Sequence, residues 1–358
     1  MITGRHATRI AFLDVGQGAT TVVSIPMTGE AVVVDCFDAA NTLDYLKSQG
    51  VRHLRGLIIT HLHLDHYASA VQFLDYCSAE LGLECERLLI NWLNCGTPKY
   101  LESVQDDHSE GFVPEPGRSH RRKRALAQIR DWAERNSRKT RSLAVEADSG
   151  ALVPGDINDA LTLIHPEHGQ MPSLLAQGFN NTAAVLKVQG IGTSALLPSD
   201  IQPPGWQTLV KNYSDVRSDV LSFPHHGAWK GADPSEILEQ IGPSIVVISV
   251  GTEGAKYGHP NREVFEAIRK RPGVRLMCTQ APAACDAHVE EKRSDVLNVT
   301  RQHERSMGRD ALVCGHGCPC AGAVVIELAE EVRVAQPEYD FHRDAIIRPH
   351  FSTPQCSV

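Results

Sequence analysis

Residues 60–66 read Thr60-His61-Leu62-His63-Leu64-Asp65-His66 and place four metal-binding side chains within six positions. On an extended loop, alternate residues point to the same side, so His61 and His63 are expected to lie together. Imidazole and carboxylate are good ligands for divalent first-row metals, and burying so many titratable groups without an ion would be costly. Solvated surface histidines are the alternative. An apolar strand at 57–59 leads directly into the segment, however, and this favours a metal site at a strand end.

Hydrophobic patterning on either side of this segment indicates alternating strands and helices. Runs rich in β-branched residues predict strands, and apolar residues at helical spacing predict helices. Strands followed by βα units favour two sheets sandwiched between helices, an α/β fold with four layers in the order αββα. The expected strands are 10–13, 20–25, 31–34, 57–59, 87–91, 161–165, 183–188, 193–197, 219–223, 245–250, 274–278 and 323–328, and the expected helices are 42–49, 69–81, 121–136, 234–241 and 262–270.

Composition limits the classes of function. The 358 residues are 42% hydrophobic, and no apolar run approaches the roughly 20 residues that span a bilayer. No apolar signal segment opens the sequence, so a soluble protein of the cytoplasm, without a membrane partner, is expected. A net charge of −8 excludes coating of nucleic acid by bulk electrostatics, so any such binding needs a local basic patch. We expect one main domain at 1–336, with insertions at 97–155 (basic, helical) and 279–321 (cysteine-rich), and a tail at 337–358.

Five motifs in fixed order resemble those of one family. The pattern HxHxDH at His61–His66 resembles the signature of the metallo-β-lactamase superfamily. The closer resemblance is to the soluble hydrolase domain of ComEC-type competence proteins, over about residues 9–278 and 323–328. It implies the αββα metallo-β-lactamase sandwich and a hydrolase. The other motifs are Asp14–Gly18 (DVGQG), Leu196–Asp200 (LLPSD), Pro224–Gly227 (PHHG), and Ser249–Gly251 (SVG) followed by Tyr257–Pro260 (YGHP).

The resemblance implies two divalent ions, zinc or manganese. His61, His63 and a later histidine, best matched by His165, would hold the first ion. Asp65, His66 and one of the pair His225 and His226 would hold the second, and Asp200 would bridge them. We take His225 as the ligand, leaving His226, with Asp65 and His259, as catalytic candidates. From the residues alone, Asp200 ends an apolar strand where a bare carboxylate would be costly, whereas His165 reads equally well as a capped loop residue and His259 as a structural turn residue.

The chain departs from the family pattern at a few positions near the expected site. Ala19 stands where the family has Asp, Cys36-Phe37 replaces a small residue and Gly, and Ser199 replaces a Gly. None of these changes removes an expected ligand. Asn180-Asn181-Thr182 partly retains an N-N-x-S stretch, and Asn181 is a candidate substrate-binding residue.

Hydrolysis by a metal-activated water is the expected chemistry. The resemblance favours phosphodiester bonds of nucleic acid as the substrate. The segment 118–141 adds local support with ten Lys or Arg against two acids, and the run Arg121, Arg122, Lys123 and Arg124 could bind phosphates. A solvated helix face explains this run equally well. The same chemistry suits a lactone, thioester or cyclic nucleotide as substrate, and a metal-stabilised binding module that acts with a partner protein is the non-enzymatic interpretation.

Ten cysteines are present, and five of them fall between Cys278 and Cys320. In a reducing compartment such cysteines are metal ligands or buried apolar residues more often than disulfides. A long loop without periodicity needs a cross-link or a bound ion to hold it in one conformation, so a structural zinc is expected in this insertion. Free thiols or a redox-dependent bridge are the alternatives. The candidate zinc ligands are Cys278, Cys285, Cys314, His316, Cys318 and Cys320, whereas Cys36, Cys77, Cys85 and Cys95 read as core residues.

Overall fold

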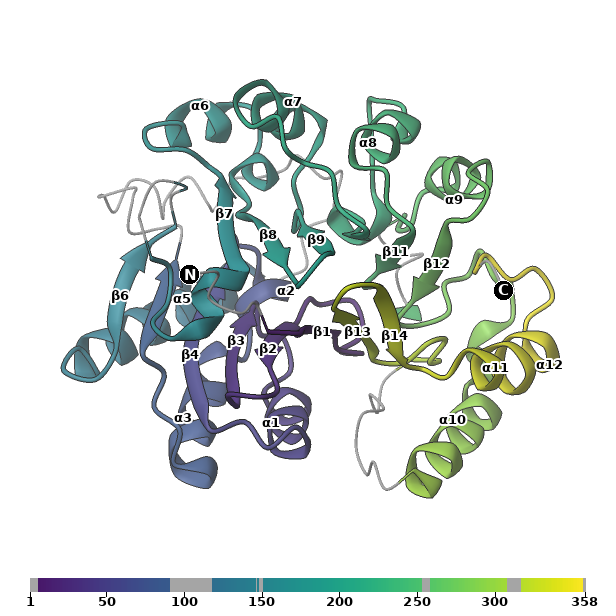
Figure 1. Ribbon diagram of the computed structural model, residues 1–358, viewed down its shortest axis with the longest axis horizontal. Helices are drawn as coiled ribbons and strands as arrows, with labels where there is room; N and C mark the ends of the chain where they lie inside the picture. Colours follow the sequence, from purple (N-terminus) through teal and green to yellow (C-terminus); the bar gives the residue numbers. More distant parts are fainter. Residues whose placement is uncertain are drawn as a thin grey trace.

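The computed structural model describes residues 6–90, 118–145, 147, 151–252, 258–307 and 317–356. Two β-sheets face each other across a shared apolar layer, and helices cover their outer faces (Figure 1). The expected four-layer αββα sandwich is confirmed. Burial explains this arrangement, because each sheet presents one apolar face to the other sheet and a second apolar face to its helices.

The first sheet has eight strands. Its β3–β6 half is parallel, and its other strand pairs are antiparallel. The central strands are wholly buried, as expected for runs such as EAVVV in β3. In spatial order the strands are β14 (Val332–Gln336), β13 (Val324–Leu328), β1 (Thr8–Phe12), β2 (Thr21–Ile25), β3 (Glu30–Val34), β4 (His53–Ile59), β5 (Arg87–Ile90) and β6 (Arg141–Ala144).

The second sheet has six strands, of which β9 to β12 run parallel. Its apolar strands, such as IVVI in β11, are buried on both faces. In spatial order they are β12 (Arg275–Cys278), β11 (Ile245–Ile248), β10 (Val220–Ser222), β9 (Ser194–Leu197), β8 (Val185–Gln189) and β7 (Leu161–His165).

Helices pack on the outer faces through apolar stripes. Helix α8 (Pro234–Ile241) illustrates the local signals: Asp233 caps its first turn by accepting from the Ser235 amide at 2.8 Å, and Gly242 ends it in the left-handed conformation. The first sheet carries α1 (Ala39–Ser48), α3 (Ala70–Leu81) and α5 (Arg118–Arg135), and the second carries α7 (Pro203–Asn212), α8, α9 (Arg262–Arg269) and α10 (Val289–Ser306). The short helix α2 (Leu64–Tyr67) contacts α5, and α6 (Met171–Ala176) packs against the turn at Phe179–Thr182 and lies beside α7 in Figure 1.

Two segments differ from the sequence-based expectation. The stretch from 280 to 320 contains the 18-residue helix α10, which was expected to be irregular. Its buried stripe is sparse, with Val289, Val296, Leu297 and Thr300 among charged residues, so its apolar periodicity is weak. The expected tail forms α11 (Tyr339–Phe341), a π-helical turn at His342–Ile347 and α12 (Arg348–His350), which pack beside α10 (Figure 1). Among the described residues, no helix combines the length and apolarity that crossing a bilayer requires.

Candidate metal centre

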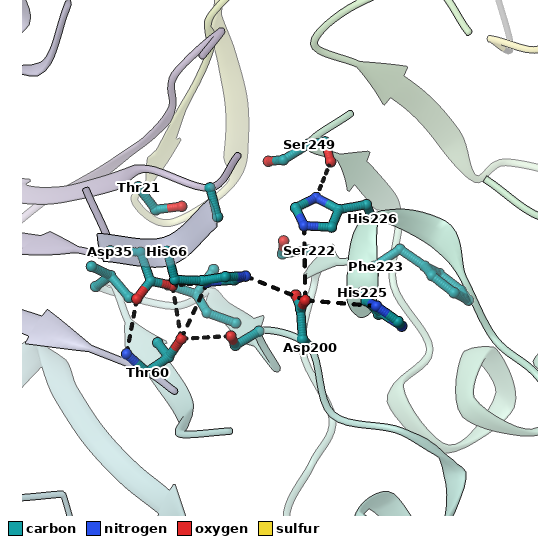
Figure 2. A pocket seen from close by; sticks show the side chains of 14 residues that line it. Thr21, Asp35, Thr60, His66, Asp200, Ser222, Phe223, His225, His226 and Ser249 are labelled. Atoms are coloured by element: carbon teal, nitrogen blue, oxygen red, sulfur yellow. Dashed lines mark hydrogen bonds and ion pairs between the residues drawn. The ribbon is translucent and has the colours of Figure 1, made fainter. Parts of the chain in front are cut away.

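The candidate ligands follow the carboxyl ends of strands in both sheets. Asp35 and Thr60 follow the neighbouring parallel strands β3 and β4, and the His61–His66 segment continues from Thr60 into α2. In the second sheet, Asp200 follows β9 and the pair His225-His226 follows β10. Because parallel strands end at the same edge of a sheet, residues far apart in sequence meet there (Figure 2).

Two groups of potential metal ligands share Asp200. His61, His63 and Asp200 form one group, and Asp65, His66, Asp200 and His226 form the other, with the ligand atoms of each group within 4.8 Å of one another. The Nε2 atoms of His66, His61 and His226 lie 3.3, 3.8 and 3.8 Å from Oδ2 of Asp200. Two ligands that each sit about 2.1 Å from a tetrahedral ion are roughly 3.4 Å apart, so these separations suit shared ions.

Buried nitrogen atoms provide an independent test of the fit to metal. The Nε2 atoms of His61, His66 and His226 are buried and make no hydrogen bond within the described part of the chain. A buried polar atom without a partner costs about 1–3 kcal/mol, and here three such atoms face one carboxylate. Metal ions would satisfy all three, so the residues present fit a metal centre.

Neighbouring groups fix the orientation of the two second-site histidines. Asp35 accepts from Nδ1 of His66 at 2.7 Å, and the same carboxylate accepts from the amide and the hydroxyl of Thr60, each at 2.8 Å. His226 donates through Nδ1 to the carbonyl of Ser249 at 2.7 Å. A carboxylate or a carbonyl can only accept here, so each Nδ1 carries a proton and each ring turns Nε2 towards Asp200, where it would bind a metal ion once deprotonated.

Electrostatics in the metal-free site couple the carboxylates to the histidines. Burial disfavours the ionised form of Asp200, but the nearby charges of His66, His226 and His225 outweigh it and hold its pKa well below the usual value. Burial likewise opposes a charge on His66, yet Asp200 and Asp35 raise its pKa well above the usual value. The pKa of His61 is lowered by burial and by the charge of His66. Metal binding and protonation therefore compete for the same buried histidines and carboxylates.

The comparisons with known proteins agree with this geometry. Residues 13–88 match the family model described as the metallo-beta-lactamase superfamily. ComE operon protein 3 of Bacillus subtilis (strain 168) is 24% identical over 293 residues, or 75% of this chain. The chain is therefore similar to the metallo-β-lactamase superfamily over residues 13–88, and its two sheets have the αββα arrangement that this resemblance implied. The chain spans 31% of the length of that relative. The solved structure of human tRNase Z, short form, covers 69% of this chain and 94% of its own, with 12% identity and a TM-score of 0.34.

In this candidate metal centre, the geometry groups His226 with the other candidate ligands, whereas the sequence led us to expect His225 there. His226, and not His225, joins Asp65, His66 and Asp200. His225 keeps its Nε2 3.9 Å from Asp200, and its ring is held by the amides of Gln202 and Asn180. Sequence could not separate the pair, because the turn that aims them depends on left-handed backbone at both residues, with φ of 49° and 53°.

His165 is not brought into either ligand group. It is buried at the end of β7, and its Nε2 donates to the carbonyl of Asn181 at 2.9 Å. The ligand role expected for His165 is therefore not supported by this geometry. Asn181 is also engaged elsewhere, because its side chain binds the Gly205 amide and the Gln177 carbonyl. Its role in substrate binding stays a prediction, and the neighbouring Asn180, which sequence reasoning missed, is the residue that reaches His225.

The sequence motifs around the candidate metal centre pack against one another through glycines. A Cβ on Gly227 would lie 2.5 Å from Cβ of Pro260, and one on Gly251 would lie 2.5 Å from the Gln17 amide nitrogen. The PHHG turn therefore packs closely against Gly258-His259-Pro260, and the DVGQG turn packs closely against the SVG segment. His259 lies at this junction, with its ring 4.8 Å from that of His225. Tyr257 lies outside the described residues.

The basic run lies close to the metal-binding segment. Helix α5 packs Leu126, Ile129 and Trp132 into the core of the first sheet and contacts both α2 and α3. Burial raises the pKa of Tyr67, the residue after His66, and the nearby charge of Arg122 opposes that rise. Arg121, Lys123 and Arg124 are exposed on the same helical turns.

Proposed function

We propose that this chain is a hydrolase that uses two divalent ions, zinc or manganese, to cleave phosphodiester bonds in nucleic acid. The observation that supports a hydrolase is that two groups of potential ligands share Asp200, and that Nε2 of His61, His66 and His226 makes no hydrogen bond to the described residues. When bound, the ions would lower the pKa of a coordinated water and stabilise negative charge on the attacked group. His61 and His63 would hold one ion, Asp65, His66 and His226 the other, and Asp200 both.

The side chains around the ligands supply the remaining functions. Asp65 would orient the attacking water, since its carboxylate lies 3.6 Å from Nε2 of His226 in the second ligand group. His225 lines the same cavity (Figure 2), does not belong to a ligand group and lies next to His259, so this pair is suited to protonating the leaving oxygen. The cavity volume of about 40 Å³ suits an ion and its water, so the substrate itself would lie at the mouth.

The position of α5 supports a nucleic-acid substrate. Arg121, Arg122, Lys123 and Arg124 occupy the first two turns of a helix that contacts α2, the helix carrying Asp65 and His66. The dipole of a helix disfavours cations in its first turns, so helix stability does not explain four of them there. A phosphate chain running past the metal centre would explain them. The resemblance to competence-type hydrolase domains favours the same substrate.

A paired charge-reversal experiment tests the proposal. Arg121, Arg122, Lys123 and Arg124 are changed to Glu, and single- and double-stranded DNA cleavage is measured against salt, alongside turnover of a small chromogenic phosphodiester. We expect DNA cleavage to fall strongly and the salt slope to flatten by about one unit per lost phosphate contact, with small-diester turnover nearly unchanged. A matched control reverses Arg135 and Arg138 at the opposite end of α5, where DNA cleavage should stay near wild type.

Competing functions predict different outcomes. Equal DNA cleavage by the reversed protein and the wild type at every salt concentration would remove α5 from substrate binding and favour a small substrate such as a lactone, thioester or cyclic nucleotide. No hydrolysis of any of these by metal-loaded protein would favour a metal-stabilised module that binds a partner protein. The identity of the metal and a cytoplasmic location stay predictions.

A further inference from the structure

Thiol and imidazole side chains gather at a second place, beside the carboxyl end of β12. Cys278 ends that strand, Cys320 precedes β13, His342 begins the π-helical turn, and Cys356 lies close to the end of the chain. All four side chains are buried. Of the six ligands expected from sequence, Cys278, Cys285 and Cys320 lie here, whereas His342 and Cys356 come from the segment expected to be a tail.

The remaining expected ligands are placed differently. Cys318 is buried in another environment, where its amide donates to the Thr252 hydroxyl at 2.7 Å, and it belongs to no candidate ligand group among the described residues. The described residues therefore do not group Cys318 with Cys320. Cys314 and His316 lie outside the described residues. The sequence spacing predicted ligands within Cys314–Cys320. In the fold, Cys320 instead contacts His342 and Cys356, which lie 22 and 36 residues further along the chain.

The distances match a tetrahedral metal site. Sγ of Cys320 lies 3.6 Å from Sγ of Cys356 and 3.4 Å from Nε2 of His342, and the three atoms lie within 4.8 Å of one another. Zinc–sulfur and zinc–nitrogen bonds of about 2.3 and 2.0–2.1 Å give ligand separations of roughly 3.8 Å (S to S) and 3.6 Å (S to N). A disulfide would need a sulfur separation of about 2.05 Å. The sulfurs are therefore spaced for a shared ion.

Two further cysteines surround this triad. The Cys278 side chain lies next to that of Cys356, and the two interact directly. Cys285 accepts from the Gln355 amide at 3.4 Å, so its sulfur is engaged by backbone. Cys278 is therefore the better placed of the two to complete a four-ligand set.

We propose that Cys320, His342 and Cys356, with Cys278 as the fourth ligand, bind a structural zinc ion that fastens residues 337–356 to the second sheet. Three thiolates and one imidazole are a donor set that suits zinc. The same segment is joined to the insertion by Ser352 on Asp286 and by Thr353 on the Cys285 carbonyl, so the ion would close a contact that already exists. Ile346, Ile347 and Phe351 add the apolar part of that contact.

The test replaces the metal with cobalt in the full chain under reducing conditions. Cobalt bound by thiolates gives a sulfur-to-metal charge-transfer absorption, whereas the candidate catalytic groups contain only His and Asp. We expect this absorption in the wild type, its loss in Cys320→Ser and Cys356→Ser, and its retention in His342→Cys, which restores a ligand. Cys318→Ser is the matched control, since Cys318 is equally buried two residues from Cys320, and it should keep the absorption.

A second measurement covers variants that fail to fold. Removing metal from the wild type should raise amide hydrogen exchange in residues 337–356 by about tenfold or more while β9–β11 stay protected, since structural zinc contributes directly to folding. Absence of the thiolate absorption in reduced wild-type protein, or its persistence in Cys356→Ser, would overturn the proposal. So would exchange in 337–356 that chelation leaves unchanged, or a Cys320–Cys356 disulfide that excludes the ion.

Discussion

His66 donates through Nδ1 to Oδ2 of Asp35 at 2.7 Å, and the same ring presents Nε2 to Asp200 at 3.3 Å. Asp35 itself has a left-handed backbone, with φ of 59°, at the end of β3. This strained position places its carboxylate behind a proposed ligand and beside Thr60. Asp35 therefore sets the orientation of His66 without belonging to either ligand group.

The first prediction concerns Asp35→Asn. Asn tolerates the left-handed backbone, so the fold should be retained. Loss of the carboxylate weakens the orientation of His66, and metal affinity should fall roughly 10–100-fold. Competition with a chelating dye measures this affinity. An unchanged affinity would show that Asp35 has no influence on the ligand.

A second prediction separates the adjacent histidines. His226→Ala should release about one of the two proposed catalytic ions, because it removes a ligand that Asp65, His66 and Asp200 cannot replace. His225→Ala should keep both ions and lower kcat by roughly 10²–10⁴-fold, the range for loss of a general acid. Elemental analysis and kcat are measured on both variants. The reverse pattern of metal loss would restore the assignment expected from sequence.

The third prediction is a pH dependence of stability. Burial lowers the pKa of His165 to about 4, below its unfolded value of about 6.5, although the Asn181 carbonyl partly opposes this. Between these values the unfolded chain binds more protons, so this residue makes stability fall as pH falls from about 6.5 to 4. The total effect is about 3 kcal/mol. Urea unfolding of metal-free protein should show a flatter pH profile for His165→Gln, whose amide can still donate to Asn181. An identical profile would contradict the prediction.

The fourth prediction tests the junction between the PHHG and GHP turns. Gly227→Ala places a Cβ 2.5 Å from Pro260 at a φ of +84°, so strain and a clash add. We expect a loss of about 2–4 kcal/mol in the free energy of unfolding and a clear fall in kcat, because His225, His226 and His259 shift together. Gly258→Ala is the control: its φ is +70°, but nothing lies within 4 Å of the new Cβ. It should cost only the backbone strain, about 1–2 kcal/mol.

Local sequence was sufficient for the elements whose signal is dense and short in range. β-Branched runs marked β2, β3 and β11, and the spacing of residues 61–66 marked a metal-binding segment, because alternation on an extended loop needs no distant partner. Helix α10 and the C-terminal helices were missed, since their apolar stripes are too sparse to stand out among charged residues.

Only the tertiary structure decided which distant groups meet. His226 rather than His225 joins the group because of the left-handed backbone of one turn and the carbonyl of Ser249, which follows β11. Neither feature can be predicted from the sequence PHHG. The cluster of Cys320, His342 and Cys356 arises because the chain end packs on the second sheet. The sequence by itself determined the residue types able to bind metal and the strands that carry them. The grouping of these side chains depended on parallel strands that end at the same edge and on the packing that brings distant segments together. Contacts of this kind produce no local pattern in the sequence.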